Sequence, residues 1–230
     1  MNIAIVNLST KPSPLLDSVP DFGVMIKRWL SQTMDGDEIT VFDVADAGQP
    51  VPAATDYDGF VIGGSEKGVY DDTPWMDPLR QLLHAVRTLE KPVFGICFGH
   101  QIMAEVYGGK AEHVDRGEVV GAREFVVNGQ AQNALVWHHD QVTVVPPQAT
   151  VTGSASYCPI AALTYDFPAM SVQFHPEYTG DFLGSVLNLG RGVFLDDATT
   201  DATLDSIRST KVATMVMATE AAVFFKKHNA

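Results

Sequence analysis

The chain has 230 residues, of which 46% are hydrophobic and 19% are charged. This length and balance predict a soluble protein of one α/β domain, or one domain with a small elaboration, that buries a large core without disulfides. The net charge of −13 argues against a nucleic-acid partner, because no basic patch is present to bind a phosphate backbone. No apolar run reaches the roughly 20 residues of a membrane span, and the N-terminus lacks the pattern of a signal peptide. We therefore expect a cytoplasmic protein with no membrane partner.

The first half of the chain alternates between strand and helix patterns. Short apolar runs rich in β-branched residues predict strands, and apolar stripes with helical spacing predict helices. The predicted strands are 2–8, 38–44, 57–62 and 92–96, and the predicted helices are 22–34, 75–89 and 99–107. Strands separated by helices in this order predict a mostly parallel sheet with helices on both faces.

The second half of the chain has several strand patterns in succession, with few helices between them. The predicted strands are 122–127, 135–145, 151–156, 161–165 and 169–174. They predict a mixed or antiparallel extension of the same sheet. A final helix is expected at 210–227, where it packs on the domain. The less patterned segment 180–209 is interpreted as a short helix plus a loop, either a lid over the site or an interface. Without a repeat or a linker, residues 1–230 are expected to form a single domain.

The segment PVFGICFGHQ, residues 92–101, places a cysteine between a predicted strand and a predicted helix. Gly95 and Gly99 supply the room that so tight a turn demands. Cys97 would then lie at the N-terminus of a helix, where the dipole favours a thiolate. The backbone N–H of Phe98 points the same way and can receive the oxyanion of a tetrahedral intermediate. The alternative is an inert cysteine in the core, which is a common fate of this residue.

The segment AMSVQFHPEY, residues 169–178, delivers a histidine at the end of another predicted strand. Pro176 ends the strand at once, and Glu177 follows. A histidine that takes a proton from a thiol needs a carboxylate on its other ring nitrogen, and this spacing permits the contact. Taken alone, His175 would be a surface or structural residue as readily as a base. Because open α/β sheets place their sites at strand carboxyl ends, Cys97 and His175 are expected to meet there.

Together, GICFGHQ and SVQFHPE resemble the paired motifs of class I glutamine amidotransferases, from the first strand to about Tyr178. The resemblance implies a three-layer, flavodoxin-like α/β fold and cleavage of the γ-carboxamide of glutamine, releasing ammonia and glutamate through a cysteine thioester. It implies Cys97 as the nucleophile, His175 as general base and acid, and Glu177 as the group that orients His175. The stretches 68–76 (GVYDDTPWM) and 156–160 (SYCPI) resemble stand-alone members similar to the amidotransferase of GMP synthetase.

The resemblance also implies how the substrate is held. Gly64 and Phe98 would supply the N–H groups of the oxyanion hole, and Gln101 would lie along the glutamine side chain. The other expected substrate-binding residues are Gly63, Ser65, His138 and Asp140. His139 stands where the family often has glycine, in the segment whose backbone helps hold the substrate's α-amino and carboxylate groups. Cys158 is expected to be structural, and no cofactor or metal is expected.

Three functional hypotheses remain open at this point. The chain is an amidotransferase subunit that delivers ammonia to a synthetase partner, or a γ-glutamyl peptidase or hydrolase that acts alone on a γ-glutamyl metabolite. The third hypothesis is a non-catalytic binding or regulatory module that retains the fold. Both enzyme hypotheses require a small-molecule substrate. Weak activity on free glutamine would favour the first, and rapid cleavage of γ-glutamyl conjugates would favour the second.

Overall fold

The computed structural model describes residues 1–10, 18–115 and 117–229. Its strands are β1 (Asn2–Asn7), β2 (Glu38–Asp43), β3 (Gly59–Ile62), β4 (Val93–Ile96), β5 (Lys110–His113), β6 (Val119–Val127), β7 (Gln130–His138), β8 (Asp140–Val144), β9 (Ala149–Ala155), β10 (Cys158–Tyr165) and β11 (Ala169–Val172). Its helices are α1 (Phe22–Ser31), α2 (Met76–Thr88), α3 (Phe98–Val106), α4 (Gly180–Leu189), α5 (Asp197–Ser209) and α6 (Thr214–His228). None of these described helices is long and apolar enough to cross a membrane.

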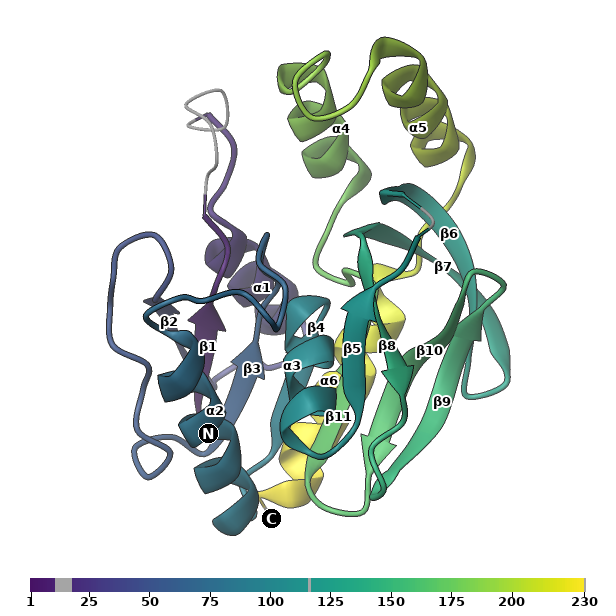
Figure 1. The fold of residues 1–230 in the computed structure, drawn as a ribbon. Helices are drawn as coiled ribbons and strands as arrows, with labels where there is room; N and C mark the ends of the chain where they lie inside the picture. Colours follow the sequence, from purple (N-terminus) through teal and green to yellow (C-terminus); the bar gives the residue numbers. More distant parts are fainter. Residues whose placement is uncertain (11–17, 116, 230) are drawn as a thin grey trace.

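One mixed sheet organises the molecule (Figure 1). Nine strands form it in the order β2-β1-β3-β4-β11-β10-β9-β6-β7. Neighbours from β2 to β11 are parallel, and from β11 to β7 each neighbour is antiparallel. The predicted α/β fold, with a parallel sheet and an antiparallel extension, is therefore confirmed.

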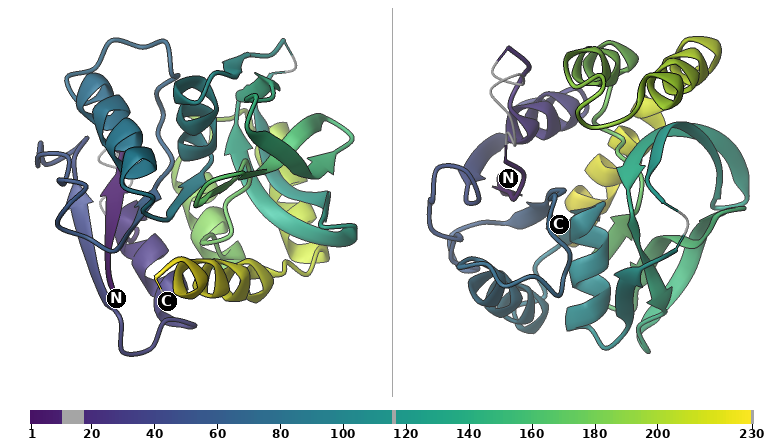
Figure 2. Two further views of the ribbon diagram at one scale, coloured as in Figure 1. Left: turned by 90° about the horizontal axis from the view of Figure 1, so that it is seen from below. Right: turned by 45° about the horizontal axis from the view of Figure 1, so that its top comes forward.

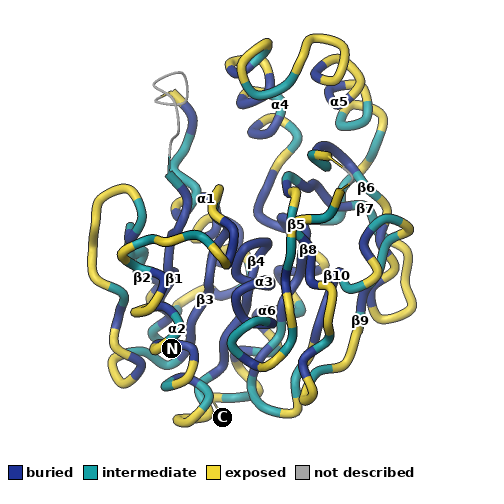
Figure 3. The backbone as a smooth tube through the Cα atoms, in the orientation of Figure 1, coloured by how far each residue is buried: buried dark blue, intermediate teal, exposed yellow. Residues whose placement is uncertain are grey.

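Helices cover both faces of the parallel strands, which gives three layers (Figure 2). On one face α1 and α6 lie together, and Trp29 of α1 donates a hydrogen bond from Nε1 to the carbonyl oxygen of Thr214 at 3.0 Å. On the other face α2 and α3 pack against each other and against the sheet. Apolar side chains of the strands fill both spaces, so the sheet separates two cores. The buried strands between exposed outer surfaces are visible in Figure 3.

Segment 180–209 forms two helices, where the sequence predicted one short helix and a loop. Both begin at capped positions: Thr179 accepts a hydrogen bond from the N–H of Phe182, and Asp196 accepts one from the N–H of Thr199. Helix α5 was missed because its sequence is mostly polar and it buries little besides Leu204 and two threonines. The pair α4 and α5 packs together above the carboxyl ends of the parallel strands, with α5 against β6 (Figure 1).

The predicted strand 135–145 is wrong as a single element. The chain breaks at His139, so that β7 ends in the large sheet while β8 pairs with β5 in a separate two-stranded sheet. Strand β5 was not predicted, because its four residues, KAEH, carry no apolar alternation. The final helix also starts four residues later than predicted. The segment before the helix contacts β7 instead: the N–H of Ala213 donates to the carbonyl oxygen of Asn133 at 3.1 Å.

A buried histidine, His100 of α3, ties this helix to the neighbouring strands. Its Nδ1 lies 2.8 Å from Oγ of Ser171, and its Nε2 lies 3.1 Å from the carbonyl oxygen of Ile160. Burial lowers the pKa of His100 to about 4. The ring is therefore neutral in the folded protein at pH 7.

This shift predicts a loss of stability in acid. The unfolded chain takes up the His100 proton near pH 6.5, but the folded protein does so only near pH 4. The contribution is complete above pH 6.5 and is lost as the pH falls toward 4, by at most about 3 kcal/mol. His100→Gln removes this titration, so its free energy of unfolding, measured in urea, should depend less on pH over that range. His84→Gln, on the exposed face of α2, is the control, and identical slopes for wild type and His100→Gln would contradict the assignment.

Candidate active site

Cys97 occupies a strained turn between β4 and α3. Its backbone has φ 53° and ψ −102°, a conformation that residues other than glycine rarely adopt and that costs free energy. Hydrogen bonds on both sides fix the turn: the N–H of Cys97 donates to Val172 at 2.9 Å, and the N–H of Gly99 donates to Gly63 at 3.1 Å. The side chain is thereby presented at the carboxyl edge of the parallel sheet, as the sequence predicted.

Gly99 is required at this turn because helix α3 lies directly against β3. A Cβ atom added at Gly99 would lie 2.2 Å from the carbonyl oxygen of Ile62, which is backbone and cannot turn away. We expect Gly99→Ala to lower the free energy of unfolding by roughly 3 kcal/mol, the upper end of the cost of overpacking. The matched control is Gly184→Ala in α4, where the nearest atom lies 3.7 Å away and alanine should stabilise the helix by up to about 1 kcal/mol. Equal denaturation midpoints for the two variants would contradict this account.

The thiol of Cys97 is held by two polar neighbours. Its Sγ lies 3.8 Å from the carbonyl oxygen of Trp137, to which it can donate, and Nε2 of Gln173 donates to Sγ at 3.7 Å. Gln173 is fully buried, and its Oε1 accepts from Nε2 of Gln101 at 3.3 Å. The sequence did not predict a role for Gln173, although its polar side chain among the apolar residues of SVQF was a usable signal.

His175 follows β11 and lies beside the cysteine. Its Nδ1 donates to Oε1 of Glu177 at 2.7 Å, which leaves Nε2 for a hydrogen bond with Cys97. Both side chains border Gly64: a Cβ added there would lie 3.0 Å from Cε1 of His175 and 3.8 Å from Cβ of Cys97. Tyr178 stacks on the imidazole with ring centroids 4.0 Å apart and planes 6° apart. The structure therefore brings together the cysteine, the histidine and the carboxylate that the sequence singled out.

Electrostatics keep His175 protonated at neutral pH. Burial works to lower its pKa, but the charges and hydrogen bonds of Glu177 and Cys97 outweigh burial and raise the pKa to about 10. An imidazolium beside a sulfur nucleophile can donate a proton to a leaving group. The arrangement is therefore suited to acyl transfer.

Cys97 and His175 open into a cavity of about 650 Å³ beneath α4. Of the residues expected to bind substrate or the oxyanion, Gly64, Ser65, Gln101, His138 and Asp140 line this cavity. A cavity of about 740 Å³ between α1 and α4 reaches Glu177 but contains neither Cys97 nor His175. We place the site in the first cavity, because only that one contains the sulfur.

Two expected residues, Gly63 and Phe98, are not among those that line the cavity. The carbonyl of Gly63 is engaged by Gly99, and the Phe98 ring packs edge-on against Trp75 with centroids 5.6 Å apart. For Phe98 the expected role concerns only its backbone N–H, which lies in the first turn of α3 where N–H groups have no partner inside the helix. The carbonyl of Gly64 accepts from Oγ of Ser9 at 2.8 Å, which fixes the orientation of the peptide between Gly64 and Ser65.

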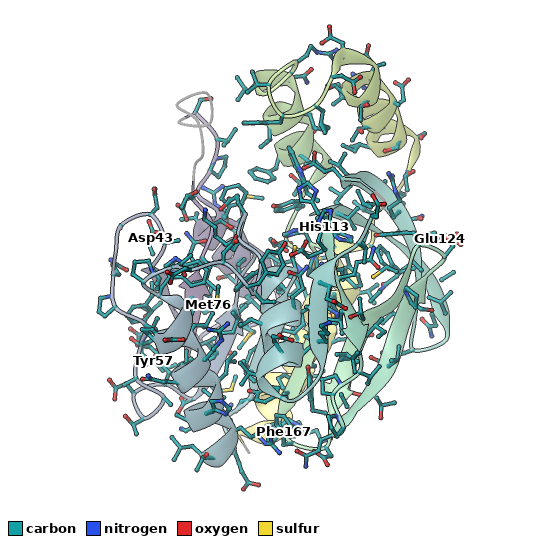
Figure 4. The ribbon with its side chains drawn as sticks, in the orientation of Figure 1. Asp43, Tyr57, Met76, His113, Glu124 and Phe167 are labelled. Atoms are coloured by element: carbon teal, nitrogen blue, oxygen red, sulfur yellow. The ribbon has the colours of Figure 1, made fainter. Side chains whose placement is uncertain are left out.

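Polar side chains form another part of the cavity wall. Nε2 of Gln101 donates to the carbonyl oxygen of Asp140 at 2.9 Å, and Nδ1 of His138 lies 3.1 Å from the same oxygen. Burial lowers the pKa of His138 to about 4, so this ring is neutral. The carboxylate of Asp140 lies 3.3 Å from Nδ1 of His113. His113 is labelled in Figure 4, below helices α4 and α5. His139 points to Glu118, with Nε2 and Oε1 3.6 Å apart.

Comparison with known proteins identifies relatives over most of the chain. Residues 18–187 match the family model described as glutamine amidotransferase class-I. γ-Glutamyl peptidase 5 of Arabidopsis thaliana is 30% identical over 169 residues, which cover 67% of each chain. One subunit of the glutamine-hydrolyzing GMP synthase of Methanothrix thermoacetophila is 36% identical over 132 residues, 52% of this chain and 67% of that one. A glutamine amidotransferase structure from Thermotoga maritima, 17% identical, has a TM-score of 0.75 over 99% of this chain and 97% of its own, which shows a shared fold.

Proposed function

The chain belongs to the class I glutamine amidotransferase family, and from this premise we propose that it hydrolyses γ-glutamyl amide bonds with Cys97, His175 and Glu177. The observation that carries the proposal is the contact of a strained cysteine at a helix N-terminus with a histidine whose other nitrogen is 2.7 Å from a buried carboxylate. Those three groups in this arrangement supply a nucleophile, a proton carrier and the residue that orients it.

The reaction proceeds in two steps. Sγ of Cys97 attacks the carboxamide carbon, and the N–H groups of Gly64 and Phe98 stabilise the oxyanion. The His175 imidazolium gives its proton to the departing nitrogen, which leaves as ammonia or an amine, and a γ-glutamyl thioester remains on Cys97. Water, deprotonated by the now neutral His175, hydrolyses the thioester, and the product is glutamate. Glu177 holds the imidazole in place throughout.

Two observations favour a chain that acts alone. Two relatives named γ-glutamyl peptidases match 67% of this chain and 67% and 68% of their own lengths, and α4 already covers the cavity. We therefore treat residues 1–230 as one catalytic domain with 180–209 as its lid. The second candidate, an ammonia-delivering subunit for a synthetase partner, is favoured by the likeness to the GMP synthase of Methanothrix thermoacetophila.

Activity without a partner separates these two functions. The purified chain is incubated with glutamine and with γ-glutamyl dipeptides, and released glutamate is measured. A hydrolase that acts alone will cleave γ-glutamyl conjugates with multiple turnovers, and faster than glutamine. Slow turnover of glutamine with no cleavage of conjugates would support the ammonia-delivering function instead. No glutamate from any of these compounds would contradict the proposed function.

A further inference from the structure

We propose that this enzyme selects γ-glutamyl compounds in which the departing nitrogen carries an uncharged, apolar substituent, either aromatic or branched aliphatic. The inference rests on the proposed function and names the substrate class of the same site. Its basis is an aromatic wall, a set of aromatic and aliphatic side chains that begins beside His175 and continues beneath α4. The residues of the aromatic wall are Phe22, Tyr178, Phe182, Leu183, Val186 and Phe194. A site built only to release ammonia has no use for such a wall.

The proton transfer from His175 places the leaving group beside the aromatic wall. The departing nitrogen receives its proton from His175, so whatever substituent that nitrogen carries extends past the imidazole. Tyr178 stacks on His175, and the ring of Phe182 follows with its centroid 5.0 Å from that of Tyr178. Phe22 of α1 closes the cluster edge-on against Phe182, with centroids 5.7 Å apart. All three rings line the cavity that contains Cys97.

Helix α4 gives this side of the cavity its apolar character. The residues by which α4 lines the cavity are all apolar: Phe182, Leu183 and Val186. Phe194, which follows α4, also lines the cavity, and its ring centroid lies 6.2 Å from that of Trp137. Asp181 of α4 faces the other cavity. An uncharged substituent would therefore remove apolar surface from water on several sides, whereas a charged one would lose hydration against this apolar surface.

The polar residues of the cavity suit the γ-glutamyl half of the substrate. Gln101, His138 and Asp140 form the polar part of the cavity wall. Each of the four carboxylates that line the cavity already has a partner. Glu118 accepts from Nε1 of Trp137 and faces His139, and Asp140 faces His113. Glu66 accepts from the N–H of Thr10, and Asp71 accepts from the N–H of Gly68. A cationic leaving group would thus have to compete with these partners for a carboxylate.

The size of the cavity agrees with a substituted leaving group. Its volume of about 650 Å³ falls within the roughly 300–1,000 Å³ of pockets that hold drug-sized ligands. The γ-glutamyl group occupies only the part near Gln101 and Cys97. The remaining space, beneath α4, would accommodate a ring or a branched chain.

Four synthetic substrates test the inference on the wild-type enzyme. γ-Glutamyl phenethylamide is compared with the ethylamide, whose amine has similar basicity but no ring. γ-Glutamyl pentylamide is compared with the 4-aminobutylamide, which has the same length but ends in an ammonium group. We expect kcat/KM to be roughly 10- to 100-fold higher for the phenethylamide than for the ethylamide, and at least about tenfold higher for the pentylamide than for its cationic match.

The possible outcomes separate this inference from the function on which it rests. Cleavage of all four amides with equal kcat/KM, or preference for the cationic amide, would overturn the leaving-group inference and leave γ-glutamyl hydrolysis intact. Cleavage of none of them, nor of glutamine, would overturn the proposed function and this inference with it.

Substitutions in the aromatic wall test whether it causes the preference for apolar leaving groups. Phe182→Ala is expected to reduce the ratio of kcat/KM for the phenethylamide to kcat/KM for the ethylamide by about fivefold or more. Phe22 is half-buried, so Phe22→Ala provides the same test if Phe182→Ala proves unstable. Val193→Ala is the matched control, because this apolar residue lies beside Phe194 but is 65% exposed and does not line the cavity. A ratio unchanged in both phenylalanine variants, with folding verified by thermal unfolding, would overturn the assignment of the wall.

Discussion

Cys97→Ser will reduce kcat/KM for γ-glutamyl amide hydrolysis by roughly 10⁴-fold or more. Removal of the nucleophile from a comparable triad abolishes nearly all catalysis, and the remainder comes from binding and the oxyanion hole. Serine is close in size to cysteine and keeps the contacts to Trp137 and Gln173, so the fold should persist. The measurement is steady-state release of glutamate by wild type and variant at equal concentration.

Cys158 supplies the matched control. It is the other cysteine of the chain, it is fully buried, and it lies in the core among residues of β10 rather than in the cavity. Cys158→Ala is expected to retain activity within a few-fold of wild type, with at most a modest loss of stability. Activity in Cys97→Ser comparable to wild type would show that the chain uses another nucleophile.

Glu177→Gln should lower kcat by roughly 10²- to 10⁴-fold. The carboxylate both fixes the orientation of His175 through its 2.7 Å contact with Nδ1 and helps to raise the pKa of the imidazole to about 10. With a neutral amide in its place, the pKa of His175 falls, and less imidazolium is available at neutral pH to protonate the leaving group.

The pH profile identifies the cause of this loss. In wild type, the alkaline decline of kcat should follow His175 as it loses its proton toward pH 10, and in Glu177→Gln the decline should move to lower pH. Because the folded-state pKa is raised, the stabilisation from this pair is complete below pH 6.5 and is lost as pH rises toward 10. Glu112→Gln, at a half-buried carboxylate that does not line the cavity, is the control. A Glu177→Gln profile with the wild-type alkaline limb would contradict the role given to Glu177.

The order of elements in the first half was predictable because each strand is a short apolar run and each helix has an amphipathic stripe. Prediction failed where tertiary contacts override local pattern. The break at His139 is invisible in a continuous strand-like sequence, since it depends on β8 leaving the large sheet to pair with β5. The late start of α6 depends on the contact between Ala213 and Asn133 of β7.

The same contrast between local pattern and tertiary contact applies to the residues of the site. Cys97, His175 and Glu177 were singled out from the sequence because a strand-to-helix turn and a strand end leave local signatures. Their roles as nucleophile, base and orienting group remain predictions that the experiments above test. The aromatic wall was not predicted, because Phe22 and Phe182 come from helices 160 residues apart in the chain and meet only when α4 folds over the cavity. Gln173, which contacts the thiol, was also missed.

The central claim is that Cys97 is the nucleophile of a preformed γ-glutamyl site. Its most direct test is intact-mass analysis after treatment with diazo-oxo-norleucine, a glutamine-like electrophile, of wild type, Cys97→Ala and Cys158→Ala. We predict one adduct on wild type, one on Cys158→Ala and none on Cys97→Ala, with excess glutamine slowing the labelling. No adduct on wild type, or an adduct that persists in Cys97→Ala, would contradict the claim.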